Sequence, residues 1–471
     1  MTTADTSAFN TESGPLAEAG LKRKVKSRHL QMIAFGSAIG TGLFLGSADS
    51  IQYAGPAVLV SFGIVGVIVY LLMRMLGEMA VQYPVSGSFA AYSREFIGPG
   101  AGFVTGWNWW FTTVVVGMLE LTAMGAFLDF WFPQIPHWTT ALVTLVLVVT
   151  LNLLNVRVFA ETEYWLSLTK IIALVLMIVL GLALIVGLGP EPAIGTAHLT
   201  QHGGFMPNGL RGVLFALVAV TFTFGGIMSI GTAAGEADTP EETIPRAVNS
   251  VIWRILVFYI GGVGVILMLA PWNEQDTNES PFTRVLSGVG FDGAASALNI
   301  VIIVAVASVL NTMTYSGARM LRDLARNSQA PRVFAATTAG GLPRRALLFN
   351  GSLMGIVVVL NYFFEGKIFT VLLAIIVGTE LITWAGVCIS HLNFRRRFAS
   401  ASPTNTTRFV APFYPVANRV CIGYFVLVLI LMAFLPEYRL GLATLILWIL
   451  GLAAIWQFKQ HRNKNRPKIP A

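Results

Sequence analysis

Long apolar runs separated by short polar or basic connections fill this chain from about residue 30 to about residue 457. About twenty consecutive apolar residues cross a bilayer as a helix. The pattern therefore predicts an all-α membrane protein with about twelve transmembrane helices. We expect the spans near 31–53, 57–77, 101–128, 138–156, 165–188, 210–233, 252–270, 295–318, 346–364, 369–391, 418–436 and 440–457.

The composition supports a membrane protein and argues against a soluble one. Hydrophobic residues make up 55% of the chain and charged residues 11%, whereas soluble domains carry about 25% charged residues. So few charges do not cover a water-facing surface, and we expect the lipid bilayer to surround the protein. The net charge of +8 could indicate a nucleic-acid partner, but its distribution follows the membrane instead.

Basic residues alternate between the connections in a way that predicts the orientation. If the N-terminus is placed inside and the twelve spans alternate, only four of the 31 Lys and Arg residues fall outside, namely Arg211, Arg284, Lys367 and Arg439. Cytoplasmic loops carry an excess of Lys and Arg. The split predicts an even number of spans with both termini in the cytoplasm.

The chain divides into a membrane domain at 30–457 and two tails. Residues 1–29 lack the features of a signal peptide, and their small polar residues predict a disordered cytoplasmic tail. Residues 458–471 predict a basic cytoplasmic tail. No separate soluble domain is expected.

Nothing in the sequence indicates an enzyme, a metal centre or a cofactor. Cys388 and Cys421 lie in or beside apolar runs and are interpreted as small buried hydrophobic residues. All six histidines are assigned to tails or connections, which argues against a buried metal site. They are His29, His137, His198, His202, His391 and His461.

Glycine is enriched at corresponding places in spans 1 and 6. "GSAIGTGLFLG" covers Gly36–Gly46, and "TFTFGGIMSIGTAAGEADTP" covers Thr221–Pro240. Small residues spaced by four positions allow close helix packing. Alternatively, glycine-interrupted helices in two inverted halves indicate the binding site of a transporter. Because spans 1 and 6 enter the membrane from opposite sides, we favour interrupted helices.

An interrupted helix has chemistry suited to a zwitterion. Its unpaired backbone groups are tolerated only around a cavity or within protein. Exposed N–H groups at the start of a half-helix attract a carboxylate, and exposed carbonyls attract an ammonium group. Two such interruptions facing each other predict a site for an amino acid.

Several long stretches resemble amino acid permeases of the amino acid transporter family, within the amino acid–polyamine–organocation superfamily. The resemblance covers nearly all the chain from about Lys22. It is carried by "SRHLQMIAFGSAIGTGLFLGSADSIQYAGPAVLV", "LGEMAVQYPVSGSFAAYSREFIGPGAGFVTGWNWW", "FAETEYWLSLTKIIAL", "AAGEADTPEETIPRAVNSVIWRILVFY" and "ISHLNFRRRF".

The resemblance implies a LeuT-like fold with a 5+5 inverted repeat. Repeat one would cover about 30–190 and repeat two about 205–392, with two peripheral helices at about 418–457. Spans 1 and 6 would be unwound in the middle of the membrane.

The resemblance also implies a substrate site around these two interruptions. The carboxylate would be held by N–H groups from Ser37, Ala38, Ile39, Gly40, Thr41 and Gly42. The amine would meet carbonyls around Phe222, Thr223 and Gly225, with Phe222 at an aromatic gating position. Many relatives carry an acid in a "GGxE" pattern, but this chain has Met228 there. Met228 favours a neutral, bulky substrate over a cationic one.

Ionisable residues inside spans are candidates for proton coupling or gating, because burying a charge in a membrane is costly. Glu120 of span 3 would carry a proton or contact substrate, or else bond a neighbouring helix as a neutral acid. In relatives, a lysine at the position of Lys170 lies against the unwound part of span 1. The alternative is that Lys170 extends to the cytoplasmic surface.

Two further acids have open roles. Glu380 of span 10 would contact a substrate side chain or bond a partner helix, and Glu236 would make a gate contact or serve as a helix-end charge. The polar residues Asn311, Thr312 and Tyr315 of span 8 would face the core.

The sequence thus predicts a secondary active transporter that imports a neutral amino acid by proton symport across a bacterial inner membrane. Amino acid exchange on the same fold is the alternative. A channel or a nutrient sensor fits less well, because the sequence shows neither a repeated pore element nor a large soluble segment. The oligomeric state is left open.

Overall fold

The computed structural model describes most of the chain. The described ranges are 39–83, 88–154, 156–188, 193–228, 240–275, 280–288, 290–338, 341–364, 368–401 and 409–464. The predicted site residues Ser37, Ala38 and Glu236 lie outside these ranges. Every regular element within them is helical.

The first half of the chain forms the helices that end before residue 202. They are α2 (Thr41–Phe44), α3 (Gly46–Ala54), η2 (Gly55–Ala57), α4 (Val58–Gln82), α5 (Ser88–Phe96), α6 (Pro99–Leu128), α7 (His137–Leu154), α8 (Val156–Ile185) and α9 (His198–Gln201).

The second half begins with α10. Its helices are α10 (Gly209–Thr223), η3 (Gly225–Met228), α12 (Pro240–Arg254), the π-helix η4 (Ile255–Gly261), α13 (Gly262–Leu269), η5 (Trp272–Glu274), α14 (Pro281–Gly288), α15 (Asp292–Arg326), η6 (Arg332–Ala335), α16 (Arg344–Met354), α17 (Ile356–Phe363), α18 (Ile368–Ala401), α19 (Val416–Phe434) and α20 (Pro436–Lys464).

The helices account for the apolar runs. Within the described ranges, nine helical stretches are long and apolar enough to cross a membrane, and His137–Leu153 and Gly209–Thr223 are shorter apolar helices. The stretch Thr41–Gln82 holds the first two predicted spans, separated at Gly55, whose φ of +59° favours glycine. The described part of each predicted span therefore is mostly helix, while the number of crossings stays a prediction.

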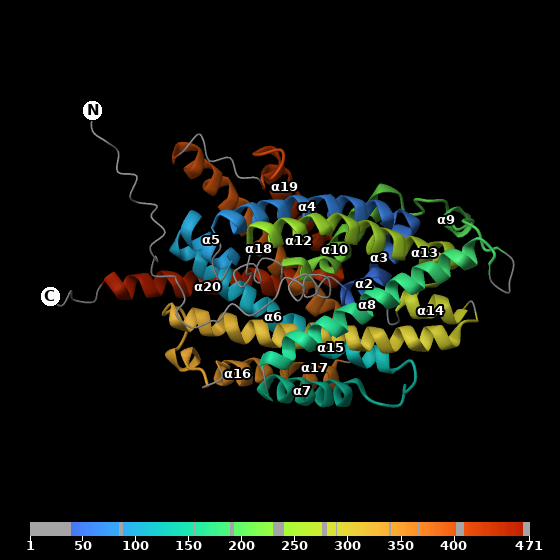
Figure 1. The fold of residues 1–471 in the computed structure, drawn as a ribbon, viewed down its shortest axis with the longest axis horizontal. Helices are drawn as coiled ribbons and strands as arrows, with labels where there is room; N and C mark the ends of the chain where they lie inside the picture. The colour runs from blue at the N-terminus through green and yellow to red at the C-terminus, as the bar shows by residue number, and fades with distance from the viewer. Residues whose placement is uncertain are drawn as a thin grey trace.

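The long helices lie side by side along the length of the molecule (Figure 1). α6 packs against both α15 and α18, and α10 packs against α3. These contacts bring predicted spans 1, 3, 6, 8 and 10 together in the interior. Apolar side chains such as Leu147, Leu176 and Leu447 remain exposed on outer helices, as expected where a protein faces lipid.

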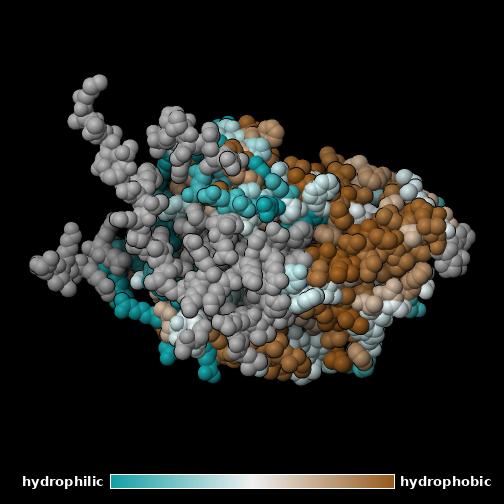
Figure 2. Space-filling view, in the orientation of Figure 1, coloured by the Kyte–Doolittle hydropathy of each residue, from teal (hydrophilic) through white to brown (hydrophobic). Residues whose placement is uncertain are grey.

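The surface separates by polarity along the same axis. One end, over α8, α13 and α14, is strongly hydrophobic, whereas hydrophilic residues gather toward the other end (Figure 2). At that hydrophilic end, α15 and α20 finish and α16 begins (Figure 1).

Candidate functional site

The first predicted interruption coincides with the start of a helix. Gly40 is extended, with φ −147° and ψ −163°, and α2 begins at Thr41. The amides of Leu43 and Phe44 donate back to the Gly40 carbonyl at 3.0 and 3.3 Å. No side chain of the described residues caps this end. Because the first N–H groups of a helix have no partner within it, they can attract an anion.

The second predicted interruption coincides with the end of a helix. Regular α-helix stops at Thr223, and the chain continues as the 3₁₀ turn Gly225–Met228. The Tyr259 hydroxyl, from the π-helix η4, donates to the Thr223 carbonyl at 3.1 Å. The last carbonyls of a helix lack partners within it and carry partial negative charge. This end therefore suits a cationic group.

Two glycines let these segments touch. A Cβ added at Gly42 would lie 2.8 Å from the Thr223 Cα, and one at Gly46 would lie 3.1 Å from the Phe222 ring. Gly40 lies at the interruption itself. Gly42 and Gly46 thus permit close packing of the two segments, while the role of the interruption in binding substrate stays a prediction.

A polar cluster surrounds the start of α2. The Thr41 hydroxyl donates to the Glu120 carboxylate, and the Lys170 ammonium donates to the Ser308 hydroxyl at 2.9 Å. Lys170 also attracts Glu120 electrostatically. Lys170 is completely buried, so it does not extend to the surface. The cluster joins predicted spans 1, 3, 5 and 8.

Sequence reasoning missed the Ser308 hydroxyl. It named Asn311, Thr312 and Tyr315 of the same helix, yet Asn311 accepts a hydrogen bond from Asn152 at 2.6 Å. Ser308 lies one helical turn before Thr312 and so on the same face of α15. The polar spacing of four residues was the signal that could have found it.

Glu380 lies against the second interruption. A Cβ added at Gly225 would stand 1.8 Å from a Glu380 carboxyl oxygen, so the missing side chain of Gly225 makes room for this acid. Glu380 is 4% exposed. Its Oε2 atom has no hydrogen-bond partner among the described residues. Met228, three residues beyond Gly225, is fully buried.

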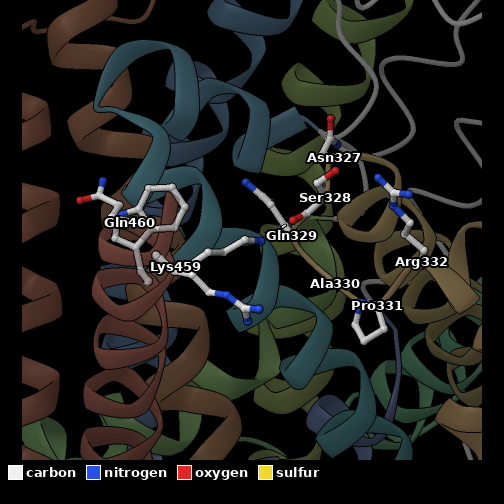
Figure 3. Close-up of a pocket in the computed structure, with 10 residues that line it drawn as sticks. Asn327, Ser328, Gln329, Ala330, Pro331, Arg332, Lys459 and Gln460 are labelled. Carbon is white, nitrogen blue, oxygen red and sulfur yellow. Dashed lines mark hydrogen bonds between the residues drawn. The ribbon is translucent and has the colours of Figure 1, made fainter. Parts of the chain in front are cut away.

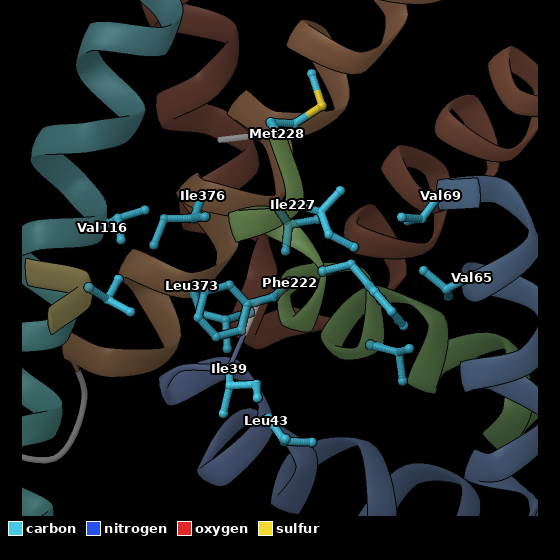
Figure 4. Close-up of a cluster of buried hydrophobic side chains, with 14 of the residues drawn as sticks. Ile39, Leu43, Val65, Val69, Val116, Phe222, Ile227, Met228, Leu373 and Ile376 are labelled. Atoms are coloured by element: carbon cyan, nitrogen blue, oxygen red, sulfur yellow. The ribbon is translucent and has the colours of Figure 1, made fainter. Parts of the chain in front are cut away.

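Apolar side chains fill the space around the two interruptions (Figure 4). All of them are buried in one core cluster. Val116 precedes Glu120 by one turn of α6, and Ile376 precedes Glu380 by one turn of α18, so each acid shares a helix face with an apolar residue. The residues in this lining are Ile39, Val116, Phe222, Ile227, Leu373 and Ile376.

A second buried charge cluster lies away from the predicted site residues. The assignment of His391 to a connection was wrong, because α18 continues to Ala401 and buries this side chain. His391 Nε2 lies 3.2 Å from Glu78 Oε2, and Arg395 Nε lies 2.6 Å from Glu78 Oε1. The Ala411 amide donates to the same carboxylate at 2.6 Å.

Other histidine and cysteine residues are also placed. His137 begins α7 and pairs with Asp129 at 2.6 Å. Cys388 and Cys421 are buried free thiols, as predicted. Within the described part of the chain, no group of three or more His, Cys, Asp or Glu side chains is arranged to hold a metal ion.

An open pocket occurs at the hydrophilic end of the bundle, between the end of α15 and the end of α20 (Figure 3). It is lined by polar and basic side chains that include Gln329, Arg332 and Lys459. None of the predicted site residues lines it.

Comparison with known proteins identifies first the fold and then the family. The structure matches the crystal structure of an Eremococcus coleocola manganese transporter with a TM-score of 0.55 and 14% identity, over 93% of this chain and 95% of that one. This likeness shows a LeuT-like transporter fold.

The family follows from the sequence. The amino acid permease family model matches residues 29–469. The aromatic amino acid transport protein AroP of Escherichia coli K12 is 40% identical over 94% of this chain and 97% of its own length. The uncharacterized amino acid permease YtnA of Bacillus subtilis is 39% identical over 94% and 96%. The chain belongs to the amino acid permease family and is a multi-pass membrane protein.

Proposed function

We propose that this permease imports a neutral amino acid with a large apolar side chain by proton symport. The observation that carries the proposal is the meeting of two interrupted helices beside a buried acid–lysine cluster. The start of α2 and the end of α10 touch through Gly42 and Thr223. They offer N–H groups and carbonyls to the two ends of one zwitterion.

The lining of the site supports a bulky apolar substrate. Ile39, Phe222 and Ile376 belong to the apolar cluster around the interruptions, and burial of apolar surface favours such side chains by about 25 cal/mol per Å². AroP, at 40% identity, is named for aromatic amino acid transport. Phenylalanine, tyrosine and tryptophan are therefore the first substrates to test.

The polar cluster supports proton coupling. Glu120 and Lys170 are both buried and interact with each other. Glu120 accepts a hydrogen bond from Thr41 at the start of α2. A change in protonation of either residue would thus alter the charge directly beside the substrate segment, which links proton and substrate through one element.

The distribution of charge supports the proposed orientation in a bacterial inner membrane. Helix ends rich in arginine, at the end of α15 and the start of α16, share the hydrophilic end of the bundle (Figure 1). Cytoplasmic loops carry such basic excess. We assign this end to the cytoplasm.

Uptake by purified protein in liposomes tests the function. A panel of labelled amino acids is offered with and without an inward proton gradient. Accumulation of aromatic amino acids above equilibrium, driven by the gradient, is expected. Uptake that appears only when amino acid is loaded inside would instead establish exchange.

A further inference from the structure

We propose that Glu380 is the counter-ion of the substrate's ammonium group and thereby selects substrates that carry an α-amine. The inference rests on the proposed function and deepens it. It places Glu380 of α18 in the same substrate site as the start of α2 and the end of α10.

The first support is the position of the carboxyl group. It fills the space that a side chain at position 225 would occupy, since a Cβ there would stand 1.8 Å from Oε1. Gly225 begins the 3₁₀ turn directly after the end of α10. Glu380 therefore lies at the helix end that carries partial negative charge.

The second support is the electrostatic state of this acid. Glu380 is almost fully buried, and Oε2 has no partner among the described residues. A carboxylate beside a helix C-terminus is repelled unless a cation or a proton joins it. Lys170, the buried cation of the site, bonds Ser308 and attracts Glu120 instead.

The third support is that Glu380 lies on the same face of α18 as two apolar residues near the interruptions. Leu373, Ile376 and Glu380 are spaced by three and four residues and form one stripe of α18. Leu373 and Ile376 lie with Phe222 in the lining (Figure 4). An amino acid whose side chain meets this lining would place its ammonium group near Glu380 and its carboxylate near the start of α2.

The test compares two ligands that differ only in the amine. Equilibrium binding of labelled L-phenylalanine is measured in competition with 3-phenylpropanoate, which lacks the α-amine. Removing one partner of a buried charge pair lowers affinity by about 30-fold or more. We expect wild-type protein to prefer phenylalanine by at least about 30-fold, and Glu380→Gln to reduce this preference by at least about tenfold.

Three outcomes would overturn the proposal. In all three, Glu380→Gln keeps the wild-type preference: both affinities stay unchanged, both fall by the same factor, or both stay unchanged while the response to a proton gradient is lost. The control is Thr379→Val, because among the described residues the Thr379 hydroxyl bonds the Ile376 carbonyl of its own helix and no other group. We expect it to keep the wild-type preference.

Two further measurements keep the test decisive. If Glu380→Gln does not fold, Gly225→Ala displaces the carboxyl group from the other side and should reduce the preference in the same way. If wild-type protein does not bind phenylalanine, the proposed substrate class fails. The preference is then measured with the amino acid that is bound and its deamino analogue. Failure of the proposed substrate class is thereby distinguished from failure of the proposed role of Glu380.

Discussion

Two buried acids, Glu78 of α4 and Glu380 of α18, have opposite surroundings. Glu78 is 2% exposed and is contacted by Arg395, His391 and the Ala411 amide. Glu380 is 4% exposed and keeps one oxygen without a partner among the described residues. The two acids are buried to a similar extent. They differ in how many hydrogen-bond and ion-pair partners their carboxyl groups have.

The difference separates a charge that holds helices together from one available to a ligand. The contacts of Glu78 tie α4 to α18 and to the segment before α19. A paired buried charge becomes strongly destabilising when one partner is removed. An acid with one oxygen unpaired among the described residues, beside a helix end, is stabilised by binding a cation.

The largest expected effect is on Glu78. Glu78→Ala leaves Arg395 and His391 without their shared carboxylate and should lower the free energy of unfolding by about 3–5 kcal/mol. Thermal unfolding in detergent measures this. Glu380→Leu is the matched variant and should unfold at or above the wild-type temperature, because it removes an incompletely paired buried acid. Greater destabilisation by Glu380→Leu would reverse the comparison.

The next effect concerns the contact between the interrupted segments. Gly42→Ala places a methyl group 2.8 Å from the Thr223 backbone, and such overpacking destabilises by about 1–3 kcal/mol. We expect reduced substrate binding together with lower thermal stability.

The control for this substitution is Gly63→Ala on α4, where an added Cβ meets nothing within 4 Å. It should leave binding unchanged and stability equal or about 0.5–1 kcal/mol higher. Equal behaviour of the two variants would show that the glycine contact at Gly42 has no special role.

Substitution of Lys170 tests whether the polar cluster around it serves transport, as proposed for Glu380, or holds helices together, as Glu78 does. Lys170→Met keeps length and removes the charge. We expect proton-driven accumulation to fall by at least about tenfold, while exchange of internal for external amino acid continues. Loss of both activities with unchanged folding would contradict a specific coupling role.

The smallest effect is expected at Thr41. Thr41→Val removes the hydroxyl that donates to Glu120, and one such hydrogen bond is worth about 0.5–1.5 kcal/mol. Uptake should fall about two- to tenfold. Thr112→Val serves as the control, since the Thr112 hydroxyl bonds the Asn108 carbonyl of its own helix. Equal losses in both variants would refute a specific role for Thr41.

Hydropathy predicted the helices because a bilayer requires long apolar segments. The glycine enrichment in Gly36–Gly46 and Thr221–Pro240 predicted interrupted helices, and in the structure α2 begins at Thr41 and α10 ends at Thr223. Resemblance to a family implies that Lys170 lies against the unwound part of span 1, and that contact stays a prediction; in the structure Lys170 donates to Ser308 of α15.

The remaining features depend on contacts between segments far apart in the chain. The contact between Glu380 and Gly225 joins residues more than 150 positions apart, and no local pattern specifies it. His391 was assigned wrongly because the apolar run ends where "HLNFRRR" begins. The helix nevertheless continues, and His391 pairs with Glu78. In both cases the sequence does not specify which side of the helix packs against which distant segment.

The central claim, proton symport of a neutral amino acid, is tested most directly by measuring charge movement. Phenylalanine carries no net charge, so its import with a proton moves one positive charge, whereas exchange for another neutral amino acid moves none. Proteoliposomes on a supported membrane, at equal pH on both sides, are exposed to phenylalanine. We predict an inward positive current that disappears in Lys170→Met. Uptake of labelled phenylalanine without any current would contradict the account.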